Sequence, residues 1–161
     1  MCCKFSSKLL ELSYSNIPLK QRRNFPMIHV IMGLKGSGKT KKLIDSINAA
    51  IAEANGDVVC IEYGKKLTYD VNYRARLVDS QEYGISTPDM LKGFISGLHA
   101  GNFDITNVYI DNLYKTIGND RAAGEDFILW AAQFAEANKM EITVTVSDDA
   151  ALASEEVKKY L

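Results

Sequence analysis

The stretch MIHVIMGLKGSGKT, Met27–Thr40, decides how this sequence folds. It opens with an apolar run that predicts a buried strand, and it continues into a segment that we call the glycine loop (Gly33–Thr40). Apolar residues then recur at helical spacing over 43–54, and Asn55-Gly56 is a typical helix stop. A strand, a glycine-rich turn and a helix N-terminus in this order can surround a phosphate group with backbone N–H groups.

The glycine loop fits the pattern GxxxxGK[ST] in full. Lys39 can reach the β- and γ-phosphates of a nucleoside triphosphate, and the Thr40 hydroxyl can bind Mg²⁺. A turn without a ligand would not require a Lys-Thr pair at the start of the helix. We therefore expect ATP or another nucleoside triphosphate to bind the whole loop, with Lys39 also acting in catalysis. The binding residues are Gly33, Leu34, Lys35, Gly36, Ser37, Gly38, Lys39 and Thr40.

Four further apolar runs alternate with segments of helical periodicity. The runs are Val58–Glu62, Ala75–Asp79, Val108–Asp111 and Ile142–Val146. Their lack of polar alternation is typical of strands buried on both faces. Residues 27–161 are therefore expected to form a single α/β domain with about five strands in a mainly parallel sheet flanked by helices.

The helical segments of the second half are predicted from their caps and apolar stripes. One begins at Ser86 or Thr87 and ends at Gly101, a second ends near Asn138, and a short one follows Ser154. We expect the apolar members of these stripes to face the core. In the first and last of these helices they are Met90, Leu91, Phe94, Ile95, Leu98, Val157 and Leu161.

The segment NVYIDN supplies an aspartate at the end of a predicted buried strand. Asp111 follows the glycine loop by about 70 residues, the order expected for a second half of a nucleotide site. Its carboxylate would bind Mg²⁺ together with Thr40. The alternative is that Asp111 only caps the turn that follows it.

With these two motifs, residues 27–161 resemble a P-loop NTPase. The resemblance implies that Gly33–Thr40 is the Walker A segment and Asp111 the Walker B aspartate. The order of segments is also similar to the nucleotide-binding core of thymidine kinases and to short bacterial P-loop proteins labelled as twitching-motility ATPases. Thymidine kinases carry a catalytic glutamate where this chain has Asn112, and their zinc-binding cysteines are absent here, so nucleoside kinase activity is not expected.

Asn112 cannot accept a proton at neutral pH, so a base must come from elsewhere. Glu62, at the end of the second predicted strand, is the candidate catalytic base, and its alternative role is that of an ordinary rim carboxylate. Ser147 and Asp148 could contact the γ-phosphate or cap a helix. The segment 114–126 is expected to be a loop that can move over the site, and its Lys115 and Arg121 could supply positive charge.

These features predict slow, Mg²⁺-dependent hydrolysis of ATP by a nucleotide switch or an ATPase that a protein partner activates. The alternatives are a small phosphotransferase with an unknown acceptor and a nucleotide-binding module without turnover. Lys65, Lys66, Arg74 and Arg76 alternate with tyrosines in 63–76, a composition that can stack on bases. The net charge of −1 nevertheless argues against nucleic acid and membrane surfaces as partners.

Residues 1–26 hold five basic side chains and one acidic side chain. We expect a basic tail that is disordered or loosely docked, or a chain that begins at Met27. No apolar stretch approaches the ~20 residues of a membrane span. The three cysteines have no metal-ligand spacing and are consistent with a reducing cytoplasm, and Cys60 is expected to be a small buried apolar residue.

Overall fold

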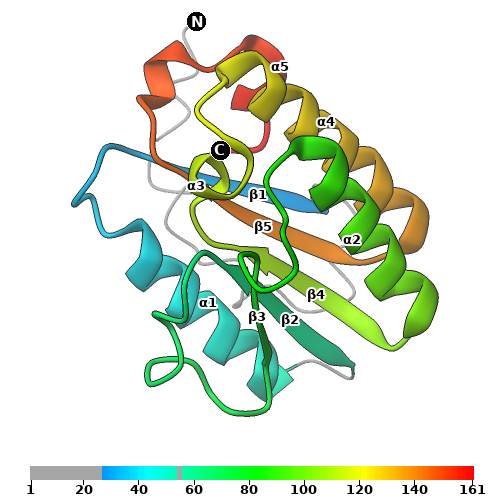
Figure 1. The fold of residues 1–161 in the computed structure, drawn as a ribbon. Coiled ribbons are helices and arrows are strands. Elements are labelled where there is room, and N and C mark those ends of the chain that lie inside the picture. The colour runs from blue at the N-terminus through cyan, green and yellow to red at the C-terminus, as the bar shows by residue number, and fades with distance from the viewer. Residues whose placement is uncertain (1–26, 54–55) are drawn as a thin grey trace, which may run out of the picture.

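The computed structural model describes residues 27–53 and 56–161 (Figure 1). The predicted basic tail and the predicted helix end at Ala54 and Asn55 lie outside the described residues. Five strands form one sheet in the order β1-β5-β4-β2-β3, and every neighbouring pair is parallel. The predicted α/β fold with a five-stranded sheet is therefore confirmed. The strands are β1 (Ile28–Met32), β2 (Asp57–Glu62), β3 (Arg76–Asp79), β4 (Ile105–Ile110) and β5 (Glu141–Val146).

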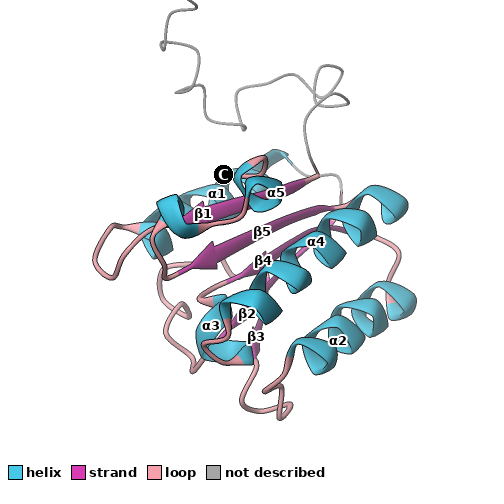
Figure 2. Ribbon diagram, turned by 90° about the horizontal axis from the view of Figure 1, so that it is seen from above, coloured by secondary structure: helices cyan, strands magenta, loops and turns pink. Residues whose placement is uncertain are grey.

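Helices cover both faces of the sheet. The helix α1 (Lys39–Glu53) lies on one face, and α2 (Pro88–Gly101) and α4 (Arg121–Asn138) lie side by side on the other (Figure 2). Three short helices complete the described part of the chain: α3 (Leu113–Ile117), a 3-10 helix (Ala150–Leu152) and α5 (Glu155–Lys158). Thr87 caps α2 by accepting a hydrogen bond from the backbone of Met90, and Pro88 occupies its first turn, as the sequence predicts.

The core is divided by the sheet into two clusters. On the α1 face, Leu43 and Ile47 pack with Cys60 and Tyr109, which point to that side from β2 and β4. On the opposite face, the alternate residues of the strands pack under α2 and α4, with Phe127 and Ile128 of α4 fully buried. Each such apolar side chain contributes roughly 1.5–3 kcal/mol on burial. This two-sided burial explains why the strands read as nearly continuous apolar runs.

The strand order decides where the candidate site residues meet. Because all five strands are parallel, their carboxyl ends lie along one rim of the sheet. The glycine loop follows β1 and Asp111 follows β4, and β5 lies between these two strands. Segments that are far apart in sequence therefore leave the sheet at neighbouring points of this rim.

Several expectations about the second half of the chain were wrong. Leu161 is 49% exposed and Met90 is 47% exposed, so neither faces the core. The predicted loop over 114–126 instead contains most of α3 and the start of α4, because Asn112 and Asp120 cap these two helices. Gly124 lies in α4, where an added Cβ would approach Tyr114 Cε1 to 2.5 Å, so it is a packing glycine and not a hinge.

None of the helices in the described ranges combines the length and the apolar character that crossing a membrane would require.

Candidate functional site

Backbone geometry at the glycine loop explains its composition. Gly36 and Gly38 have φ values of 85° and 81°, in the left-handed region that residues with a side chain rarely adopt. A Cβ at Gly33 would come within 2.5 Å of Ser37 Oγ. The loop is thus a tight turn whose backbone favours glycine at positions 36 and 38, while a side chain at position 33 would displace the Ser37 hydroxyl. Residues 34–38 are exposed to solvent.

Lys39 is the first residue of α1, and its side chain folds back across the loop. Its ammonium group donates to the carbonyl oxygen of Leu34 at 2.9 Å and lies 3.5 Å from Ser37 Oγ. Lys39 is only 8% exposed although the loop around it is open. No carboxylate pairs with it within residues 27–53 and 56–161, so the loop holds a positive charge that an anion could neutralise.

Thr40 and Asp111 meet at the mouth of the loop. The Thr40 hydroxyl donates to Asp111 Oδ1 at 3.3 Å, although the two residues are 71 positions apart. The backbone N–H of Asp111 donates to the carbonyl of Ile61 at 2.9 Å, which continues the pairing of β4 with β2. The two predicted magnesium ligands are therefore in direct contact.

Thr145 of β5 fixes the position of Asp111. Its hydroxyl donates to Asp111 Oδ1 at 3.0 Å and accepts from the backbone N–H of Asn112 at 2.7 Å. Thr145 is 1% exposed, so this hydroxyl serves the two residues inside the protein. We call Asp111, Asn112 and Thr145 the rim cluster. Sequence reasoning did not predict Thr145, for which the available signal was a pair of threonines, Thr143 and Thr145, inside an otherwise apolar buried strand.

Asn112 shapes the backbone after Asp111. It has a φ of 54°, in the left-handed region that asparagine tolerates better than most residues. Its side-chain oxygen accepts from the backbone N–H of Lys115 at 3.4 Å and caps α3. Asn112 therefore has a structural function in this chain.

Glu62 is buried on the same rim, with 2% of its surface exposed. Its Oε2 accepts from the backbone N–H groups of Lys66 and Leu67 at 2.7 and 2.9 Å. No hydrogen bond joins Glu62 to the glycine loop or to the rim cluster in the described part of the chain. Burial, and secondly the negative charges of Glu62 and Asp111, raise the pKa of the Cys60 thiol well above its usual range. Cys60 is fully buried, as predicted.

Arg121 and Asp148 form a two-point ion pair. Arg121 Nε lies 2.8 Å from Asp148 Oδ2, and Nη2 lies 3.0 Å from Oδ1. The hydrogen bonds from Arg121 hold the pKa of Asp148 below its usual value. The predicted positive charge of Arg121 is thus neutralised within the protein, whereas Lys115 is exposed.

The protein side chains at this site are too few to hold a magnesium ion by themselves, so a nucleotide would have to supply further oxygen ligands. Among the described residues, no group of three or more His, Cys, Asp or Glu side chains could hold a metal. Thr40 and Asp111 supply two oxygen ligands, and Mg²⁺ in nucleotide sites usually completes its shell with phosphate oxygens and water. The residues present therefore fit a metal that arrives with a nucleotide.

Comparison of the chain with known protein families and with curated proteins finds no match.

Proposed function

We propose that this chain is a cytoplasmic P-loop protein that binds ATP or another nucleoside triphosphate and hydrolyses it slowly with Mg²⁺. It would serve as a nucleotide switch or as an ATPase that a protein partner activates. The observation that carries the proposal is the contact of Thr40 with Asp111, which joins the two sequence motifs at 3.3 Å. If the two motifs were unrelated, their residues would not be expected to form a hydrogen bond at the N-terminus of the helix that follows the glycine loop.

Each residue of the site has a defined role in this proposal. The phosphates bind to backbone N–H groups of the glycine loop and of the N-terminus of α1. On binding, the Lys39 ammonium group gives up its hydrogen bond to the Leu34 carbonyl and donates to a phosphate oxygen instead. Thr40 and Asp111 would hold Mg²⁺, which neutralises charge on the phosphates when bound. Thr145 orients the Asp111 carboxylate for this purpose.

Slow turnover follows from the residues around Asp111. Positioning of the phosphates and neutralisation of their charge come from the loop and Lys39, and they do not require a base. Proton acceptance typically contributes ~10²–10⁴-fold in rate. Asn112 cannot supply it. Glu62, the base expected from the sequence, has one carboxylate oxygen occupied by two backbone N–H groups, so we expect the slow reaction to proceed without it. These bonds favour a nucleotide-binding module without turnover as the second candidate function.

The phosphotransferase alternative has less support. A phosphotransferase could bind its acceptor beside Lys115 and Arg121 if the segment 114–126 were the mobile loop expected from the sequence. Helix α3 and the start of α4 instead form most of that segment. Arg121 is paired with Asp148. No observation on the described residues favours an acceptor site there.

The test is steady-state phosphate release by the full chain with ATP, GTP and Mg²⁺, together with nucleotide binding by calorimetry. We expect one-to-one binding and turnover well below about one per second for the protein alone. Glu62→Gln should leave the slow rate unchanged, because an amide oxygen can accept the same two backbone bonds. Asp79→Asn is the matched control, since Asp79 on β3 also accepts two backbone N–H groups.

Two results would contradict the proposal. Absence of nucleotide binding would remove the site altogether. Brisk hydrolysis that Glu62→Gln abolishes, and Asp79→Asn does not, would make Glu62 the base of an ordinary ATPase.

A further inference from the structure

The segment 63–75 between β2 and β3 is a loop with a buried underside. Leu67, Val71 and Ala75 are spaced four residues apart, and all three are buried in the cluster that packs around α1. In Figure 1 this loop runs along α1 from the carboxyl rim of the sheet to the start of β3. Its backbone is therefore supported by the core over most of its length.

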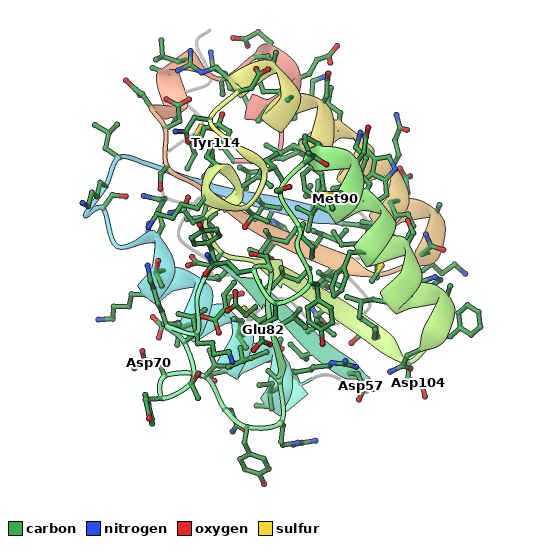
Figure 3. The ribbon with its side chains drawn as sticks, in the orientation of Figure 1. Asp57, Asp70, Glu82, Met90, Asp104 and Tyr114 are labelled. Carbon is green, nitrogen blue, oxygen red and sulfur yellow. The ribbon has the colours of Figure 1, made fainter. Side chains whose placement is uncertain are left out.

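Side-chain hydrogen bonds hold the same backbone at two places. Asn48 of α1 donates to the Asp70 carbonyl at 3.3 Å and accepts from the Asn72 N–H at 3.0 Å. At the start of the loop, Glu62 accepts from Lys66 and Leu67. The outer surface of the loop is thus presented in a fixed conformation, and the labelled Asp70 stands on it away from the sheet (Figure 3).

Two tyrosines project from this fixed backbone into solvent. Tyr69 is 98% exposed and Tyr73 is 93% exposed, and they alternate with the buried anchors of the loop. Neither ring contacts another aromatic ring in the described part of the chain. Packing of this protein does not account for them, because almost none of their surface is used.

The surroundings of the two tyrosines are mainly basic, because residues 63–76 carry four Lys and Arg side chains against one acidic side chain, the exposed Asp70. Lys66, Arg74 and Arg76 are exposed, and none forms an ion pair within the described ranges, whereas Lys65 pairs with Glu82. Lys41 and Lys42 are exposed on the first turns of α1. These cations belong to a larger asymmetry that the net charge conceals. Residues 33–76 contain eight Lys and Arg against five Asp and Glu, and residues 77–161 contain six against fourteen.

We infer that the loop 63–75, together with Arg76 at the start of β3 and the first turns of α1, forms a binding surface for single-stranded nucleic acid. Bases would stack on Tyr69 and Tyr73, and phosphates would contact Lys66, Arg74 and Arg76. A protein partner would be expected to find the aromatic rings within a partly buried apolar patch. Here the rings are almost fully exposed, and the cations of the loop outnumber its one carboxylate, Asp70, which suits a chain of flat bases joined by phosphates. The net charge of −1 that argued against nucleic acid is thus the sum of two basic segments, 1–26 and 33–76, and an acidic one, 77–161.

The experiment is fluorescence anisotropy of labelled oligo-dT and oligo-rU with the full chain, without nucleotide, over a range of salt concentrations. The double variant Tyr69→Ala/Tyr73→Ala should weaken binding by at least about tenfold, since stacking contributes ~1–3 kcal/mol per base. Arg74→Ala should reduce the steepness of log K against log salt by about 0.7. Circular dichroism shows whether each variant remains folded.

Matched controls lie elsewhere on the surface. Phe103→Ala removes an aromatic ring that is 77% exposed beside Asp104, at the opposite end of the sheet from Asp70 (Figure 3). Lys159→Ala removes an exposed cation near the C-terminus. Both should bind like the unmodified protein. The basic residues within 1–26 are present in every variant, so their contribution cancels.

Three outcomes would overturn the inference. One is no binding of either oligonucleotide at low salt, and another is equal binding by the tyrosine double variant. The third is equal competition by polyglutamate, which would indicate a surface for acidic proteins instead. The oligonucleotide titrations contain no ATP, so these outcomes would count against the nucleic-acid surface without bearing on the proposed nucleotide site.

Discussion

The glycine loop and the rim cluster lie on the same rim of the sheet, but they are built from contacts of different range. The bonds of Lys39 inside the loop reach residues two and five positions away. The rim cluster is held by hydrogen bonds of much longer range. Thr145 is 34 positions from Asp111 and 33 positions from Asn112, and Thr40 is 71 positions from Asp111. The first region is thus determined by a short stretch of chain, whereas the second exists only once the strands are ordered.

This difference separates two tasks of the candidate site. In the proposed function, the glycine loop would supply positive charge and N–H groups for phosphates. The rim cluster supplies one oriented carboxylate and a capped backbone turn. Substitutions in the first region should therefore affect nucleotide affinity with little effect on the fold, and substitutions in the second should affect both.

The largest effect is expected for Lys39→Ala. Loss of a charged partner of a bound phosphate typically costs 2–5 kcal/mol, so triphosphate affinity should fall at least about thirtyfold. The free energy of unfolding should change little, because the contacts of the Lys39 ammonium group, to Leu34 and Ser37, both lie within the exposed loop. Titration calorimetry and urea denaturation measure the two quantities. Lys35→Ala, an exposed lysine of the same loop, is the control and should have a much smaller effect; equal losses would argue against the assigned role of Lys39.

Thr145→Val tests whether the rim cluster is a structural unit. The substitution leaves the partly buried N–H of Asn112 without its acceptor, which we expect to cost about 1 kcal/mol in the free energy of unfolding. Nucleotide affinity should fall as well, because Asp111 loses a bond. Thr143→Val, two residues earlier and also buried, is the control. If both variants lose the same stability and neither loses affinity, Thr145 does not position Asp111.

The variant Asn112→Glu tests whether a carboxylate next to Asp111 in the chain can act as a general base in hydrolysis. We expect a loss of about 1 kcal/mol in stability, because the variant gives up the α3 cap and places a less suitable residue at positive φ. The phosphate-release rate should not rise, since the native side chain is directed at the backbone of α3. Asn112→Gly keeps the backbone freedom and should cost only a few tenths of a kcal/mol. A faster rate for the glutamate variant would show that position 112 faces the reacting phosphate.

The smallest effect concerns Asp148 and pH. The hydrogen bonds from Arg121 lower the pKa of Asp148, so its carboxylate stabilises the fold above the ordinary aspartate pKa of about 3.9. This contribution is lost as the pH falls through the lowered pKa of the folded state. Asp148→Asn should therefore be less stable than the unmodified protein at pH 7, and the difference should shrink in strongly acidic solution. Denaturation at both pH values tests this, with the exposed Asp126→Asn as control; a difference that does not depend on pH would contradict it.

Much of the fold could be predicted from the sequence because its signals are local. The apolar runs located all five strands to within a few residues, and the Ser86-Thr87-Pro88 signal located the start of α2. Helix α3 was missed because only five residues form it and Asn112, not an apolar pattern, starts it. Leu161 was placed in the core by spacing alone, but α5 ends at Lys158 and the periodicity does not extend to the C-terminus.

The candidate site shows the same limit. The glycine loop, Lys39, Thr40 and Asp111 follow from motif and spacing, and their assigned roles stay predictions. Thr145 could not be found in this way, because its partners depend on β5 lying between β1 and β4. Glu62 was chosen from its place at a strand end, and no local pattern indicates that its carboxylate binds the backbone of Lys66 and Leu67.

The account depends most on Thr40 and Asp111 forming one magnesium-nucleotide site. The direct test is calorimetric titration of the full chain with ATP, in Mg²⁺ and in EDTA, for the unmodified protein and Asp111→Asn. The asparagine oxygen can still accept from Thr145, so the variant should stay folded while losing the negative charge. We predict that Mg²⁺ tightens ATP binding to the unmodified protein and that Asp111→Asn removes this enhancement. An enhancement of the same size in Asp111→Asn, or ATP binding that does not depend on Mg²⁺ in the unmodified protein, would contradict the account.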